Sequence, residues 1–286
     1  MENPQVFLKN SYLRNKKKRT VFFLFLICLT LLFSNADAIS IPESDIEDTL
    51  IVMTYNIHHG RGTDGKVDID RIADLLIESK ADIVALQEVD IHTERSGKID
   101  IAKILSEKTG LKFTAFGKNL EFEGGEYGNA ILSRYPIENE ENIHFKNISG
   151  EQRGVQAAII KIYQKSLLFL NTHLDHTGND DSERVLYAEK IRDEIIPFYD
   201  QQVIFLAGDL NDVPGSRTYQ IINRRLKDAW FEAGTGEGFT IPVKNPNRRI
   251  DYIFYSGNIM PKEAKVIQTG ASDHLPLVVK FMFIND

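Results

Sequence analysis

Short apolar runs recur along the chain, and most of them end in a carboxylate, an amide or a histidine. The runs that end this way are 51–56, 83–88, 167–173, 203–211 and 250–251, and the polar group 272–274 precedes the last apolar run. Apolar runs of this length predict buried strands. Polar groups at several strand ends can meet at one edge of a sheet, so the pattern predicts a functional site assembled from distant segments.

The same pattern predicts a mixed α/β chain in which sheet and helix layers alternate. Strands are expected near 50–56, 82–88, 112–117, 129–133, 155–163, 166–173, 202–208, 250–255 and 276–284. Helices are expected after Asp68, from Ile99 to Thr109, from Asp181 to Tyr199 and from Pro214 to Ile222. Asp68 suits a helix N-cap, and Gly110 suits a helix stop. No linker or repeat divides residues 45–286, so we expect one domain there.

The first 38 residues have the three parts of a secretory signal peptide. A basic stretch at 9–19 precedes the apolar run 21–33, and Ala36-Asp37-Ala38 supplies a cleavage site between small residues. The apolar run is too short for a comfortable membrane span, which needs about 20 residues. We therefore expect cleavage near Ala38 and a secreted domain, 39–286, that is extracellular or periplasmic. An uncleaved N-terminal membrane anchor is the alternative.

Composition and charge narrow the classes of partner. The chain is 42% hydrophobic and 26% charged, which is enough for a sizeable core. Removing residues 1–38 takes away six of 34 basic and two of 41 acidic side chains, which leaves a net charge of −11. A stable, nonspecific nucleic-acid complex needs a basic surface, so none is expected. The single cysteine, Cys28, lies in the predicted signal peptide, and we expect a monomeric domain without disulfides or a membrane span.

The segment 206–211 carries the sharpest local signal, because Asp209 and Asn211 are two residues apart. In an extended strand they would face the same side. A carboxylate can orient and deprotonate a water molecule, and a nearby amide can donate hydrogen bonds to developing negative charge. Asp and Asn are also common turn residues, so a turn cap is equally open on this segment alone.

Asp251 and His274 are predicted to form a pair. An aspartate inside an apolar strand is costly unless it has a partner, and a histidine beside a carboxylate becomes a better base or a stable cation. Asp273 would then point elsewhere and be free to bind a metal. The alternative is that Asp273 caps a turn and that His274 lies on the surface.

Three further groups carry candidate chemistry. His173 follows an apolar run, and with Asp175 and His176 it suggests a zinc site as a competing hypothesis. Glu88 ends another run, and one or two carboxylates are the usual protein ligands of Mg²⁺. Asn56 ends the first run and is followed by the segment 58–60, which is either a substrate loop or a turn.

In their order along the chain, these groups resemble the endonuclease/exonuclease/phosphatase superfamily, the DNase I-like metal-dependent phosphohydrolases. The resemblance spans residues 50–284 and rests on Asn56, Gln87-Glu88, the block 128–134, Thr172-His173, the segment 208–211, the segment 249–253 and the segment 272–274. It implies a four-layer α/β sandwich, in which two mixed β-sheets pack face to face with flanking helices. It also implies that residues 39–286 are a catalytic domain of a secreted bacterial type.

The resemblance assigns roles to individual residues. It implies Mg²⁺ or Mn²⁺ held by Glu88, with Asn56 and Asp273 nearby. It implies that Asp209 activates water, that Asn211 contacts the phosphate, and that His274, paired with Asp251, binds or protonates the phosphoryl group. The remaining assignments are His173 as a phosphate contact or leaving-group assistant, Glu126 as a partner of His173, and Arg153 and Asn129 as substrate contacts.

The function expected from these features is a divalent-metal-dependent phosphoesterase that hydrolyses phosphodiester or phosphomonoester bonds. A nuclease-type substrate is slightly favoured, on grounds of resemblance only. The alternatives are a sphingomyelinase-like enzyme, an inositol-phosphate or small-metabolite phosphatase, and a catalytically inactive binding module on the same fold.

Overall fold

The computed structural model describes residues 49–146, 150–176, 180–199 and 201–284. The predicted signal peptide, residues 1–38, lies outside the described residues. Within the described ranges, no helix has both the length and the apolar character needed to cross a membrane.

Two mixed β-sheets of six strands each form the centre of the domain. The first has the order β11-β12-β1-β2-β4-β3, and the second has the order β5-β6-β7-β8-β10-β9. The strands of the first sheet are β1 (Thr49–Asn56), β2 (Ile83–Ile91), β3 (Phe113–Phe122), β4 (Gly125–Ser133), β11 (Ile259–Val266) and β12 (Leu277–Phe283). Those of the second are β5 (Ile137–His144), β6 (Gly154–Ile162), β7 (Lys165–His173), β8 (Val203–Asp209), β9 (Lys227–Asp228) and β10 (Asp251–Ser256). Only β1–β2 and β7–β8 pair in parallel among the pairings of these strands.

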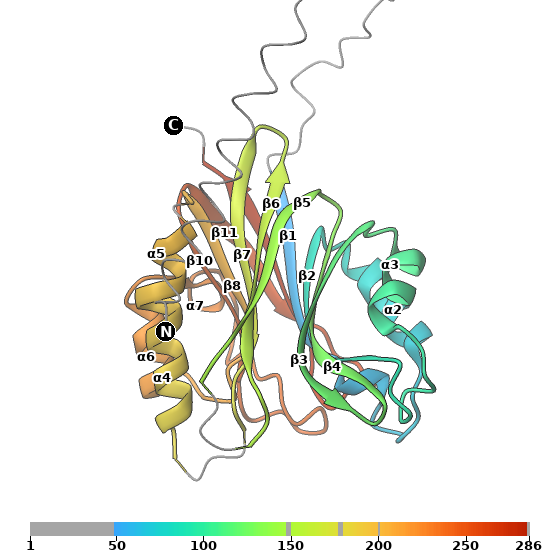
Figure 1. Ribbon diagram of the computed structural model, residues 1–286. Helices are drawn as coiled ribbons and strands as arrows, with labels where there is room; N and C mark the ends of the chain where they lie inside the picture. Colours follow the sequence, from blue (N-terminus) through green and yellow to red (C-terminus); the bar gives the residue numbers. More distant parts are fainter. Residues whose placement is uncertain (1–48, 147–149, 177–179, 200, 285–286) are drawn as a thin grey trace, which may run out of the picture. The chain divides into compact units, whose positions relative to one another are not determined.

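Helices cover the outer faces of both sheets, as Figure 1 shows. On the first sheet lie α2 (Ile69–Ser79) and α3 (Ile101–Thr109), and on the second lie α4 (Ser182–Lys190), α5 (Ile196–Tyr199) and α6 (Arg217–Asn223). A π-helical stretch, Ile191–Ile195, joins α4 to α5, and the short segments η2 (His58–Gly60) and α7 (Ala229–Ala233) complete the described helices. The predicted fold class is confirmed.

The helix signals in the sequence act as predicted. The Asp68 side chain accepts hydrogen bonds from the first backbone N–H groups of α2, and the left-handed Gly110 ends α3. The second helix begins at Ile101 rather than at the predicted Ile99, because Asp100 is its N-cap.

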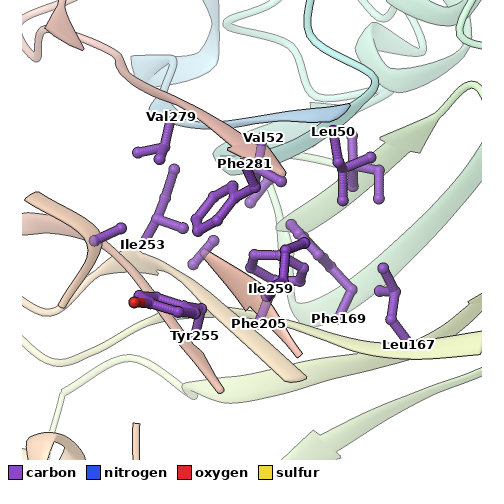
Figure 2. Packing of buried hydrophobic residues seen from close by; sticks show 14 of the residues in the cluster. Leu50, Val52, Leu167, Phe169, Phe205, Ile253, Tyr255, Ile259, Val279 and Phe281 are labelled. Atoms are coloured by element: carbon purple, nitrogen blue, oxygen red, sulfur yellow. The ribbon is translucent and has the colours of Figure 1, made fainter. Parts of the chain in front are cut away.

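Between the sheets lies the main core, which both inner faces build from alternate residues of each strand. Leu50 and Val52 of β1 face Phe169, Phe205 and other large side chains across the gap, as Figure 2 shows. The β1 residues that alternate with Leu50 and Val52, which are Ile51 and Met53, face outward and pack under α2 and α3. Both faces of the strands are therefore buried, which explains why the runs are continuously apolar. Each large side chain buried in this way stabilises the fold by about 1.5–3 kcal/mol.

Three strands, β5, β9 and β11, were not predicted. Each lies at the edge of its sheet, and many of their side chains are exposed. Exposed edge strands are rich in charged residues, which protect them from pairing with other chains. The sequences of β5 and β11, Ile137–His144 and Ile259–Val266, therefore lack the apolar runs that mark the central strands.

Candidate active site

The polar strand ends meet because of the strand register. In the parallel pair β7–β8, His173 lies opposite Asp209, and in the antiparallel pair β8–β10, Asp251 lies opposite Asp209. In the other sheet, Asn56 lies opposite Gln87. The facing sheets thus bring their polar ends to one place, as predicted from the sequence.

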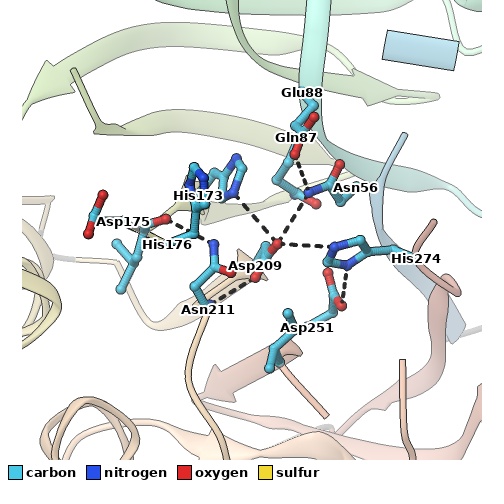
Figure 3. A network of polar contacts seen from close by, with 12 residues as sticks. Asn56, Gln87, Glu88, His173, Asp175, His176, Asp209, Asn211, Asp251 and His274 are labelled. Atoms are coloured by element: carbon cyan, nitrogen blue, oxygen red, sulfur yellow. Dashed lines mark hydrogen bonds and ion pairs between the residues drawn. The ribbon is translucent and has the colours of Figure 1, made fainter. Parts of the chain in front are cut away.

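Asp209 lies at the centre of this group (Figure 3). Its Oδ2 accepts a hydrogen bond from Nδ2 of Asn56 at 3.2 Å. The same oxygen lies 3.6 Å from Nε2 of His173 and 3.7 Å from Nε2 of His274. Burial, and then the nearby carboxylate of Asp251, raise the pKa of Asp209 to about 7. At neutral pH this carboxyl group is therefore partly ionised and binds a proton more strongly than an ordinary aspartate, as a general base requires.

Gly208 sets the position of Asp209. Its φ is +147°, and a Cβ atom at this residue would lie 2.0 Å from the carbonyl oxygen of Thr172. Only glycine allows β7 and β8 to approach so closely at the point where Asp209 leaves the sheet.

His274 and Asp251 form the predicted pair, with Nδ1 and Oδ2 at 2.9 Å and both residues buried. Burial alone would lower the pKa of His274, but the carboxylates of Asp251 and Asp209 outweigh it and raise the pKa to about 10. His274 is therefore an imidazolium at neutral pH. Its backbone N–H and the Asn56 carbonyl both bind the Ser272 hydroxyl, which ties the 272–274 segment to the end of β1.

Asn211 does not share an extended strand with Asp209, as the sequence spacing suggested. β8 ends at Asp209, and Asn211 adopts a left-handed conformation with φ of 50°. Its backbone N–H donates to Oδ1 of Asp209 at 2.8 Å, which makes the turn that the alternative interpretation proposed. Its side-chain Nδ2 donates to the carbonyl of Leu174 at 3.1 Å. The backbone N–H of Asn211 thus holds the Asp209 carboxylate in place.

Glu88 lies on a β-bulge, where the register of β2 and β4 shifts between Leu86 and Val89. Its φ is +57°, a strained conformation of the kind that clusters at functional sites. Oε1 of Glu88 accepts a hydrogen bond from Nδ2 of Asn56 at 3.0 Å. One amide group therefore holds the carboxylates of Glu88 and Asp209 together. The oxygen of Asn56 instead accepts from the backbone N–H of His58, so it faces away from Glu88.

The donor set near Glu88 suits a hard divalent cation. Mg²⁺ is held by one or two carboxylates together with water and substrate oxygens. Glu88 offers one carboxylate, and the half-exposed Asp273 offers a second at 3.6 Å from Nδ1 of His58. Asn56 would become an oxygen ligand only with its amide group turned over.

His173 has an arginine as its partner rather than the predicted Glu126. Arg153, which is 1% exposed, donates to Nδ1 of His173 at 3.1 Å and to Nδ1 of His176 at 2.9 Å. Glu126 instead pairs with Lys118 at 3.2 Å. The prediction for Glu126 was wrong, because β6 pairs with β7 in a register that places Arg153 beside the end of β7.

The geometry around Arg153 gives no support to the zinc hypothesis. A guanidinium donates hydrogen bonds and cannot accept them, so it occupies one ring nitrogen of both His173 and His176. Those two histidines and Asp175 form no metal-type group among the described residues. Burial, and then the charge of Arg153, lower the pKa of His173, which is therefore neutral at pH 7 and carries its proton on Nε2, toward Asp209.

Asn129 is buried opposite the Glu88 bulge, because Ala130 and Gly128 pair with the residues on either side of it. Its Nδ2 is buried without a hydrogen bond to any described residue.

The sequence did not reveal the polar contacts that join the two sheets under the site. Nε2 of Gln87 donates to Oδ1 of Asn171 at 2.8 Å, and the Asn171 amide donates to carbonyls of β2 and β4. Both residues lie at the polar ends of apolar runs, which was the available signal. Fully paired amides at this position fix the sheets relative to each other and so align the strand ends.

Three comparisons with known proteins give the family and the fold of the chain. A model of the Endonuclease/Exonuclease/phosphatase family matches residues 53–274. The chain is 27% identical over 250 residues to YbhP of Escherichia coli, which is described as uncharacterized. This match covers 82% of this chain and 97% of YbhP.

Two solved structures illustrate the likeness in fold. The mannosyl-6-phosphatase Bt3783 of Bacteroides thetaiotaomicron is 19% identical with a TM-score of 0.69, covering 82% of this chain and all of that one. Truncated TDP2 of Caenorhabditis elegans is 25% identical with a TM-score of 0.63, covering 82% and 97% of the two chains. Because the family match covers most of the chain, from β1 to His274, the chain belongs to the endonuclease/exonuclease/phosphatase family.

Proposed function

We propose that this chain is a divalent-cation-dependent phosphoesterase that uses Mg²⁺ or Mn²⁺. Hydrolysis of phosphoester bonds is the activity typical of its family. The observation that carries the proposal is the position of one buried carboxylate, Asp209, within 3.7 Å of two imidazole nitrogens and one amide nitrogen. Buried carboxylates with a raised pKa cluster at catalytic sites, which favours an enzyme over a non-catalytic binding module.

In an in-line attack, water forms a bond to phosphorus while the bond from phosphorus to the leaving ester oxygen breaks, and that oxygen takes up a proton from solvent. The residues have complementary roles in this step. Asp209 accepts the proton of the attacking water, since its pKa lies close to neutral pH. His274 is cationic and donates from Nε2 to a phosphoryl oxygen as negative charge develops there. His173 is neutral and donates a second hydrogen bond from Nε2.

The cation site consists of Glu88 and Asp273, with Asn56 beside them. A bound divalent ion would polarise the phosphoryl oxygens and offset the charge that builds up on them. Glu88 is held ready for this by Asn56, which also holds Asp209. The position of the ion and the position of the base are thereby coupled through one amide group.

A phosphodiester of nucleic acid is the first candidate substrate, and a sugar phosphomonoester is the second. The second is favoured by one structural neighbour, whose printed name is mannosyl-6-phosphatase. The acidic balance of the chain favours transient contact with a substrate over a stable nucleic-acid complex.

A panel of substrates tests the proposal. Plasmid DNA, RNA, sphingomyelin, inositol phosphates, mannose 6-phosphate and bis(4-nitrophenyl) phosphate would each be incubated with Mg²⁺, with Mn²⁺ and with EDTA. We expect cation-dependent hydrolysis of at least one of them, and its loss in His274→Ala and Asp209→Ala. Asp74→Asn, on the exposed face of α2, is the matched control. Full activity in either site variant would refute the assignment, and inactivity of the wild-type chain on every substrate would favour the binding module.

We further propose that residues 1–38 direct export and are removed. N-terminal sequencing of protein recovered outside the cytoplasm would test this. A new N-terminus near Ile39 supports the proposal, and an intact Met1 in a membrane fraction supports an anchor instead.

A further inference from the structure

Beside Glu88 lies a group of side chains that the proposed mechanism does not use. Each of His58, His59 and Glu88 offers one ligand atom, and these atoms lie within 4.8 Å of one another. Both histidines belong to the η2 segment that follows β1, and the sequence suggested only a substrate loop or a turn there. Nitrogen and carboxylate donors gathered at this spacing can share one ion.

The two histidines are placed there by an unusual backbone. Both have positive φ, 45° for His58 and 46° for His59, which is uncommon in residues other than glycine. The turn is fixed at one end by the hydrogen bond from the His58 backbone N–H to Asn56. It is fixed at the other end by Gly60, where a Cβ atom would lie 2.4 Å from Ile69. The rings are thereby held edge to face, with centroids 4.5 Å apart.

His59 provides the second observation. It is 5% exposed, and its Nδ1 is buried without a hydrogen-bond partner among the described residues. A buried polar nitrogen without a partner costs about 1–3 kcal/mol. Such a cost is accounted for when the ring has a ligand that hydrogen bonding within the chain does not supply.

His58 lies between two carboxylates. Its Nδ1 is 3.6 Å from Oδ1 of Asp273, and its ring also belongs to the group around Glu88. It is the more exposed of the two histidines, so it can reach an ion that arrives from solvent.

We propose that His58 and His59 join Glu88 as ligands of the divalent cation, and that the site prefers a first-row transition ion such as Mn²⁺ or Zn²⁺ to Mg²⁺. Mg²⁺ takes oxygen ligands and gains little from imidazole, whereas Mn²⁺ and Zn²⁺ accept nitrogen together with carboxylate. This inference rests on the proposed function in that it assigns a cation to Glu88, and it adds the identity of the ion and two further ligands.

Pulsed electron paramagnetic resonance of the full chain loaded with one equivalent of Mn²⁺ tests this directly. Nitrogen bound to Mn²⁺ produces ¹⁴N modulation of the spin echo, which oxygen ligands do not. We expect this modulation in the wild-type chain and its loss in the His58→Gln/His59→Gln double variant. His144→Gln, an exposed histidine on β5, should retain it. Absence of modulation in the wild-type chain, or its persistence in the double variant, overturns the proposal.

Calorimetric titration gives a second measurement that does not depend on activity. The dissociation constants of Mn²⁺ and Zn²⁺ should rise about tenfold or more in each single variant, while that of Mg²⁺ changes little. An equal loss for all three ions would mean that the histidines only support the fold. A chain that shows nitrogen ligation but hydrolyses no phosphoester would refute the proposed function and leave this inference standing. An active chain without nitrogen ligation would refute this inference and leave the proposed function standing.

Discussion

Replacing Asp209 with asparagine should make the protein more stable while removing its activity. Asp209 is buried, and burial together with the Asp251 carboxylate raises its pKa from the ordinary 3.8 to about 7. A carboxyl group whose pKa is higher in the folded state than in the unfolded chain destabilises the fold at any pH above the unfolded value. That penalty is absent below pH 3.8, grows through the interval up to pH 7, and is complete above it. Asparagine has nearly the same shape and no charge, so it does not incur this penalty.

The size of the effect follows from the shift. A change in pKa from 3.8 to about 7 corresponds to about 4 kcal/mol of lost stability above pH 7. The variant also loses a benefit, because Asp209 is one of the three carboxylates that favour the charged form of His274. We therefore expect a net gain in the free energy of unfolding of about 1–3 kcal/mol at pH 8 and close to zero at pH 5. Each kcal/mol should raise Tm by about 2–4 °C in a domain of this size.

The measurement is thermal and urea unfolding of Asp209→Asn and wild type at pH 5 and pH 8, both in EDTA. EDTA is needed because a cation at Glu88 would itself favour the ionised form of Asp209. The control is Asp74→Asn, which removes an exposed carboxylate and should change stability equally little at both pH values. A loss of stability in Asp209→Asn at pH 8, or an equal gain at both pH values, would refute the reasoning.

Three other perturbations test separate parts of the site. Asp251→Asn removes the charge that pairs with His274 at 2.9 Å, so kcat/KM on the best substrate of the panel should fall about 10²–10⁴-fold. Circular dichroism would confirm that the variant is folded. An unchanged kcat/KM would show that the pair is only structural. Gly208→Ala forces a Cβ to within 2.0 Å of the Thr172 oxygen, so it should cost about 3 kcal/mol or more and lower Tm visibly in a melting curve. Treatment with EDTA should abolish hydrolysis, and added Mn²⁺ should restore it at lower concentration than Mg²⁺; rescue by Mg²⁺ alone would argue against the imidazole ligands.

The strand ends could be predicted from the sequence because strands buried on both faces have continuously apolar sequences. Continuous apolar runs showed where central strands lie, and the residue that interrupts each run showed where it leaves the core. Asp209, Asp251 and His173 fall at those interruptions, and strand register then brings them together without any further information. The same reasoning failed for β5, β9 and β11, because an edge strand needs no apolar run.

The finer geometry of the site could not be predicted, because it depends on departures from regular structure. The expectation that Asp209 and Asn211 share a face assumed an extended strand, but a left-handed residue turns the chain between strand and loop. Glu88 faces the site from a bulge, and a bulge changes the side on which a residue points. Single-residue shifts of this kind depend on tertiary packing and leave little trace in residue spacing.

The two histidines beside Asp209 differ in charge because their partners differ in charge. His274 is bonded to the carboxylate of Asp251 and is cationic, whereas His173 is bonded to the guanidinium of Arg153 and is neutral. The predicted partner of His173, Glu126, would have made both rings cationic and placed two positive charges beside Asp209. That arrangement would lower the pKa of Asp209 and weaken it as a base. In the proposed mechanism, Arg153 leaves His274 as the one imidazolium beside Asp209 to stabilise the phosphoryl oxygens, and Asp209 retains the proton affinity of a general base.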